Sequence, residues 1–198
     1  MWLIPLFGLL LTSGLLPGQD YFPPGALDRN PHRDEFKVNW YSKHLQALQE
    51  PSLWGLSRED PNAEVYRFLW LRSFHHPIAV RLILQGDGSG WLTSRITSGQ
   101  GGYDPGKLIG TTSSLLNKAK TQSLLTAIES ANIWDLSTYP DTNEVVGLDG
   151  AQWIIEGVGN SRCHIIDRWS PNARDPVRAI GILALKLGRP KIPSAEIY

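Results

Sequence analysis

Hydrophobic and polar positions alternate most clearly between residues 64 and 98. Residues 65–74 and 78–85 are rich in β-branched and aromatic side chains with partial two-residue alternation. A His-His-Pro corner follows the first run, and a Gly-Asp-Gly-Ser-Gly turn follows the second. The pattern predicts a three-stranded meander around which the rest of the chain is organised.

Three further segments, residues 34–49, 121–131 and 175–187, carry apolar side chains at helical spacing. Pro51 ends the first pattern, and Asn132 suits a left-handed stop after the second. The third pattern is bounded by a cap, a first-turn proline and two stop residues: Asp175, Pro176, Gly188 and Pro190. We therefore expect three helices.

Residues 151–158 and 162–169 form a second alternating pair around Gly159-Asn160-Ser161, which predicts a hairpin with a three-residue turn. Together with the meander this gives an α+β fold with a five-stranded, mainly antiparallel sheet. Two helices cover one face, and the additional N-terminal helix packs on the edge or the other face. The predicted organisation is a targeting segment at 1–19, an arm and helix at 20–63, and a core domain at 64–190.

The register of each strand follows from requiring one apolar face, because a one-residue slip exchanges the faces. A two-residue corner at His75-His76 places these residues of the first two strands inside: Leu69, Leu71, Ile78, Val80, Leu82 and Leu84. The outer face then carries Tyr66, Phe68, Trp70, Arg72, Arg81 and Ile83. A three-residue turn at 87–89 adds Leu92 and Ile96 inside, with Trp91, Thr93 and Arg95 outside.

The last hairpin sorts in the same way. Its inner residues are predicted to be Ala151, Trp153, Ile155, Cys163, Ile165 and Trp169, with Asp167 as a carboxylate on the apolar face. Its outer residues are Gln152, Glu156, Arg162, His164 and Arg168.

The outer face gathers the residues most typical of a ligand-binding surface: Trp70, Arg72, Arg81, Trp91 and Arg95. Guanidinium groups pair with carboxylates or phosphates, and aromatic rings stack on sugars or cations. Arg81 and Arg95 are expected to lie opposite each other, which requires an anion between them. Glu156 or Glu35 could supply it, with the 34–49 helix lying across the face. Alternatively, an anionic envelope polymer supplies it from outside.

His75, His76 and Asp167 are the most enzyme-like residues, because histidine titrates near neutral pH. With a hydroxyl such as that of Ser73 they would form a hydrolase triad. The alternatives are a solvated pair of histidines at a strand corner and a buried Asp bonded to backbone N–H groups or to an arginine.

Composition narrows the classes of partner. Lys and Arg together number 19, as do Asp and Glu, so no overall field attracts nucleic acid. Cys163 is the only cysteine, which excludes an internal disulfide and a thiolate zinc site and favours a buried, inert thiol. The glycine-rich run at 99–106 lacks the lysine of a phosphate-binding P-loop and is interpreted as a connection. We expect no cofactor and no metal.

An apolar run at residues 2–16 has the length of a signal-sequence core and is short for a bilayer span. It predicts export to the periplasm or the exterior, with a mature chain beginning near Asp20. The alternative is an uncleaved membrane anchor, which would be the chain's one contact with a membrane.

Two stretches carry a family resemblance: Tyr-Arg-Phe-Leu-Trp-Leu-Arg-Ser-Phe-His-His-Pro at 66–77 and Asp-Arg-Trp-Ser-Pro at 167–171. They resemble uncharacterised exported bacterial proteins of unknown function, over roughly residues 64–188. The resemblance implies an envelope-located α+β domain and brings no activity or site with it. The leading functional hypothesis is an exported binding module for an unknown envelope component or anionic polymer. The alternatives are a hydrolase and a structural envelope protein held at the membrane.

Overall fold

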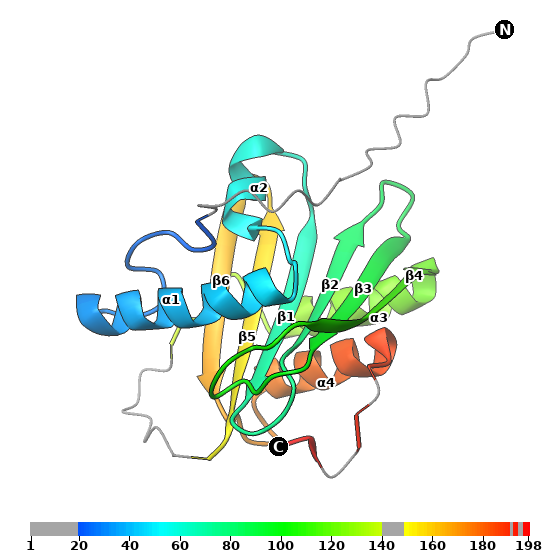
Figure 1. Ribbon diagram of the computed structural model, residues 1–198. Helices are drawn as coiled ribbons and strands as arrows, with labels where there is room; N and C mark the ends of the chain where they lie inside the picture. Colours follow the sequence, from blue (N-terminus) through cyan, green and yellow to red (C-terminus); the bar gives the residue numbers. More distant parts are fainter. Residues whose placement is uncertain (1–19, 140–148, 191, 194–195) are drawn as a thin grey trace, which may run out of the picture.

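The strands of the protein form one antiparallel sheet in the order β4-β3-β2-β1-β5-β6 (Figure 1). The computed structural model describes residues 20–139, 149–190, 192–193 and 196–198, so the predicted targeting segment lies outside the described residues. The strands are β1 (Val65–Arg72), β2 (Ile78–Leu84), β3 (Gly90–Thr97), β4 (Leu108–Leu116), β5 (Ala151–Gly159) and β6 (Arg162–Trp169). The helices are α1 (Pro31–Ala47), α2 (Leu53–Glu59), α3 (Lys118–Ser130) and α4 (Pro176–Gly188).

The α+β class with one antiparallel sheet is confirmed, but the sheet has six strands and not five. The strand that the sequence analysis missed is β4, an edge strand whose residues 111–115 are all exposed. Because neither face of its middle is buried, the strand has no apolar alternation to reveal it. The short helix α2 lies between the first predicted helix and the meander, where the sequence pattern predicts no helix.

Helices α3 and α4 cover one face of the sheet, as expected for two helices on one side (Figure 1). The core there is aromatic and aliphatic: Phe68, Trp70, Val80, Leu82, Trp153, Ile166, Ile180 and Ala184. Helices α1 and α2 cover the other face. The α1 side buries Tyr41, Leu45, Leu48, Leu69, Ala79, Ile154 and Ile165. Within the described residues no helix is long and apolar enough to cross a bilayer.

Capping side chains explain where the helices begin. Asn30 accepts hydrogen bonds from the backbone N–H groups of His32 and Arg33, and Asn117 accepts one from that of Lys120. Helix α3 therefore begins at Lys118, three residues before the predicted segment 121–131. Asp175 caps α4 as predicted.

The predicted face of β1 is wrong, and the chain connection explains why. Ser73 to Pro77 link β1 to β2, a longer connection than the two-residue corner assumed. Phe68 consequently pairs with Val80 and Trp70 with Ile78, so the β1 aromatics face α3 and α4. Leu69 and Leu71, predicted inside with Ile78, lie under α1. The faces of β3 agree with the prediction, since Leu92 and Ile96 pack in the α3/α4 core.

The last hairpin is also inverted in its second strand. Asn160 and Ser161 form a two-residue turn with φ of 51° and 57°, as hairpin turns of the primed type require. Trp153 lies in the α3/α4 core as predicted. The one-residue difference moves the predicted inner residues of β6 to the α1 side: Cys163, Ile165, Asp167 and Trp169.

Candidate ligand-binding site

The five residues predicted to bind ligand do not form one surface. Trp70 and Arg72 lie on the α3/α4 face, whereas Arg81, Trp91 and Arg95 lie on the α1 face. Trp70 is fully buried and Arg72 is 1% exposed, with its guanidinium bonded to Glu196 and to the carbonyl of His76. Of the five, Trp91 alone is strongly exposed, at 44%.

A buried carboxylate that the sequence analysis did not consider neutralises the arginines under α1. Glu50 accepts a 2.7 Å hydrogen bond from Nε of Arg81, and its other oxygen lies 3.5 Å from Nη1 of Arg95. Arg67 pairs with Glu156 at 2.7 Å and lies 3.6 Å from Glu50. These five residues form the Glu50 cluster, and their anions come from the protein itself.

Within the Glu50 cluster, Arg67 shows how burial and pairing compete. Burial by itself would lower the pKa of Arg67, but the charges of Glu156 and Glu50 outweigh it and raise that pKa. The expected juxtaposition of Arg81 and Arg95 is wrong, because Arg81 pairs with Thr93 across the β2–β3 ladder and Arg95 with Ala79. The Glu50 cluster therefore fastens the end of α1 to the sheet.

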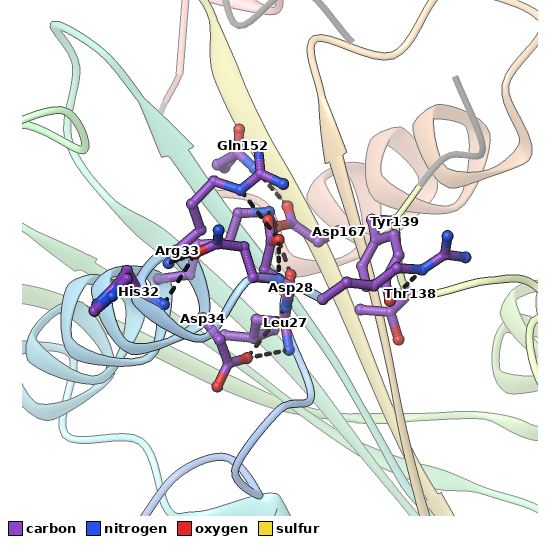
Figure 2. Close-up of polar contacts among 12 residues, drawn as sticks. Leu27, Asp28, His32, Arg33, Asp34, Thr138, Tyr139, Gln152 and Asp167 are labelled. Atoms are coloured by element: carbon purple, nitrogen blue, oxygen red, sulfur yellow. Dashed lines mark hydrogen bonds and ion pairs between the residues drawn. The ribbon is translucent and has the colours of Figure 1, made fainter. Parts of the chain in front are cut away.

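Asp167 belongs to a second buried cluster (Figure 2). Its carboxylate accepts hydrogen bonds from Tyr41 at 2.9 Å, from Lys37 at 3.0 Å, and from Gln152. Burial, followed by the charge of Asp167, raises the pKa of Tyr41 well above its usual value. The Asp167 cluster therefore joins α1 to β5 and β6.

The two histidines of the predicted triad, His75 and His76, have partners other than Asp167 and Ser73. His75 Nδ1 lies 2.8 Å from the hydroxyl of Tyr198, and His76 Nδ1 lies 2.8 Å from the carbonyl oxygen of Gly99. Ser73 is buried, with its hydroxyl donating to the carbonyl of Gly150. No described contact joins either histidine to Asp167 or to Ser73, so the structure does not assemble the predicted triad.

A groove on the α3/α4 face combines positive charge with open space. It has a volume of about 360 Å³ and lies between β4, the first turn of α3 and the last turn of α4. Its polar lining residues are Thr112, Ser114, Lys120, Lys186 and Arg189. The lining includes no acidic side chain, and among the described residues none of the three cations has an ion pair. We call this the basic groove.

The end of α4 places two of these cations. Gly188 brings the helix close to the sheet, since a Cβ there would lie 3.1 Å from Val80 and 3.2 Å from Ser94. Arg189 then takes a left-handed conformation with φ of 49°. Such a conformation costs a non-glycine residue roughly 1 kcal/mol or more, and it is a common way for a helix to end. Lys186 lies in the last turn, where it also complements the helix dipole.

The basic groove can hold an anion through charge and hydroxyl groups. Lysine and arginine donate charge-assisted hydrogen bonds to carboxylates and phosphates, and the hydroxyls of Thr112 and Ser114 can donate one each. Within the part of the chain that is described, no three His, Cys, Asp or Glu side chains gather to hold a metal ion. Burial, then the charge of Glu156, raises the pKa of Cys163 to about 12, so its thiol stays protonated.

The basic groove leaves no local pattern in the sequence, because its residues come from three separate elements. Lys186 and Arg189 stood at a helix end that was interpreted only as a stop, and Thr112 and Ser114 lay in an unassigned stretch. The signal present was the Thr-Thr-Ser-Ser run between Leu-Ile-Gly and Leu-Leu, which is free of proline and compatible with a polar edge strand.

No family model matches the chain, and a search of curated proteins gave no match. The resemblance to exported bacterial proteins therefore stays a prediction from the sequence.

Proposed function

We propose that the chain is a binding module that holds an anionic partner in the basic groove. The observation that carries this proposal is the groove itself: about 360 Å³ lined by Lys120, Lys186 and Arg189 with no carboxylate. In the Glu50 cluster, by contrast, every arginine already lies near a buried glutamate. The positive charge that lines the groove is therefore available to a partner.

The strength expected of this site is modest. Exposed ion pairs contribute about 0.2–1 kcal/mol each, so three of them supply about 1.5 kcal/mol, or roughly tenfold in affinity. Such contacts weaken with salt because the charges face solvent. The groove therefore suits a partner that makes several contacts at once.

The test is binding of fluorescein-labelled heptaglutamate to the full chain, followed by anisotropy at low and high salt. Replacing Lys120, Lys186 and Arg189 by Gln should weaken binding about tenfold and flatten its salt dependence. The matched control carries the same charge change at three exposed cations outside the groove: Lys107, Arg162 and Arg174. Equal loss in both variants would mean that net charge, not the groove, attracts the probe.

The cellular location in this proposal rests on the apolar run at residues 2–16 and on the family resemblance. Mass spectrometry of the protein from its native host provides the check. A chain starting near Asp20 in the envelope or medium is the expected product. Met1 retained on a cytoplasmic protein would contradict export.

A further inference from the structure

No described backbone group pairs with the outer edge of β4. The strand is the last in the sheet, no other described element lies beyond it, and residues 111–115 are exposed (Figure 1). An edge strand presents unpaired backbone N–H and C=O groups at every second residue. Proteins usually protect such an edge with charges, proline or a covering segment. The nine residues of β4 include no charged residue and no proline.

The two faces beside this edge differ in chemistry. On the α3/α4 side, Thr112 and Ser114 line the basic groove. On the other side, Trp91 pairs with Leu115, and the two are 44% and 61% exposed. A strand added next to β4 would have alternate side chains over these two surfaces, because successive side chains of a strand point to opposite faces.

We propose that β4 takes an extended acidic peptide segment as a seventh strand, and this rests on the proposed function of the basic groove. The added strand would lie about 4.8 Å from β4. Its acidic side chains would stand beside Thr112 and Ser114, within reach of Lys120, Lys186 and Arg189. Its apolar side chains, alternating with them, would cover Trp91 and Leu115. Backbone pairing supplies affinity and the alternation supplies specificity.

Charge distinguishes this occupant from a second copy of the chain. Antiparallel pairing of two β4 edges about a two-fold axis would set the same face of both copies side by side. Two basic grooves would then lie next to each other, and like charges so placed repel. An acidic segment neutralises the groove, so the edge favours it over self-association.

The test uses full-length protein and labelled eight-residue peptides with capped ends. The probe alternates Glu and Val, and its control has four Glu followed by four Val. We expect the alternating peptide to bind at least about tenfold more tightly, since the control cannot match both faces. Two further probes carry N-methyl groups either on all Glu amides or on all Val amides. Only one of these two sets of amides would face β4. One methylated probe should therefore bind about tenfold or more weakly, and the other should bind as tightly as the unmethylated peptide.

A second readout uses Leu115→Ser, at an exposed position where folding is not at risk. This variant should weaken the alternating peptide severalfold and heptaglutamate much less, because Leu115 borders the groove without contributing charge and heptaglutamate has no apolar side chains. Sedimentation velocity on the free protein should show a monomer.

The outcomes separate the two proposals. Equal binding of all four peptides, abolished by Gln at the three groove cations, would overturn strand addition and leave the groove as an anion site. Absence of binding by every peptide and by heptaglutamate would overturn both proposals. A dimer that dissociates on Leu115→Ser would assign the edge to a second copy and overturn the acidic segment.

Discussion

The two edges of the sheet are protected very differently. At β6, the backbone N–H of Asp167 donates to the carbonyl of Thr138 at 2.6 Å, and Arg168 donates to the carbonyls of Thr138 and Ser137. At β4, no described segment pairs with the outer edge, and the strand has no charged residue. An edge left open beside a basic groove is the part of the fold best placed to meet a partner.

The two ends of the sheet also differ in how far helix α1 covers them. Over β5 and β6, α1 is held by the Asp167 cluster, and the Glu50 cluster fastens its end near β2 and β3. Over β3 and β4, Trp91 and Leu115 remain exposed. Substitutions on the covered side should therefore change stability, and substitutions on the open side should change binding.

The largest expected effect is at the Glu50 cluster. Glu50→Ala leaves Arg81 and Arg95 without their carboxylate in a site where the Glu50 side chain is fully buried. Removing one partner of a buried ion pair costs about 3–5 kcal/mol. Urea unfolding measures this loss. Thr111→Ala on the open edge is the control and should stay within about 0.5 kcal/mol of the parent.

The next effect is a loss of stability in mild acid through His44. This residue of α1 is fully buried. Burial, followed by the charge of Lys43, lowers its pKa from 6.5 to about 4. Below pH 6.5 the unfolded chain binds a proton at His44, whereas the folded chain binds it only as the pH approaches 4. Stability from this group is complete above pH 6.5, falls with decreasing pH, and by pH 4 has dropped by about 3 kcal/mol.

His44→Leu checks the source of that pH dependence. Neither ring nitrogen of His44 makes a hydrogen bond of ordinary geometry with a described residue, and the Gly101 backbone near the ring opposes the pKa shift only weakly, so an apolar replacement removes at most a weak contact. The variant should be at least as stable as the parent at pH 5, and its unfolding free energy should change less between pH 6.5 and 4. An unchanged slope would place the acid sensitivity in other groups.

A smaller loss is expected on the covered edge with Asp167→Asn. The amide keeps the shape of the carboxylate but not its charge, which weakens the bonds from Tyr41 and Lys37. Hydrogen bonds to charged groups contribute about 1.5–3 kcal/mol, and Lys37 is partly solvated, so we expect about 1–3 kcal/mol. Thermal denaturation gives the value. A melting temperature equal to the parent's would mean that the Asp167 cluster does not hold α1.

The smallest change in stability should come from charging the open edge. Ser113→Lys adds a protective charge to an exposed residue of β4 and removes the hydrogen bond between the hydroxyls of Ser113 and Thr93, with an expected effect within about 1 kcal/mol. Chemical denaturation measures it. A loss of several kcal/mol would show that the outer part of β4 is covered in solution.

How far the sequence predicts this fold depends on burial. The aromatic and β-branched runs of β1, β2, β3 and β5 were found because their buried faces leave a periodic pattern. The β4 strand was missed because an exposed edge needs no apolar alternation. The faces of β1 and β6 were inverted by turn lengths wrong by a few residues, since one residue exchanges the faces of a strand.

The site could be predicted even less well. Trp70 and Arg81 were expected on one surface, but the register of β1 places them on opposite faces of the sheet. Glu50 follows the α1 helix without any local pattern, and only the packing of α1 on the sheet brings it to Arg81 and Arg95. The groove cations come from three elements, and sequence spacing does not record their approach.

Amide hydrogen exchange at the two edges tests the central claim most directly. In the free protein, alternate amides of residues 111–115 in β4 should exchange rapidly, while the amide of Asp167 on the outer side of β6, which donates to Thr138, should be protected. Adding the alternating Glu-Val peptide should slow the fast β4 amides and leave the Asp167 amide unchanged. Protection of β4 in the free monomer, or fast β4 exchange that saturating peptide does not alter, would contradict the account.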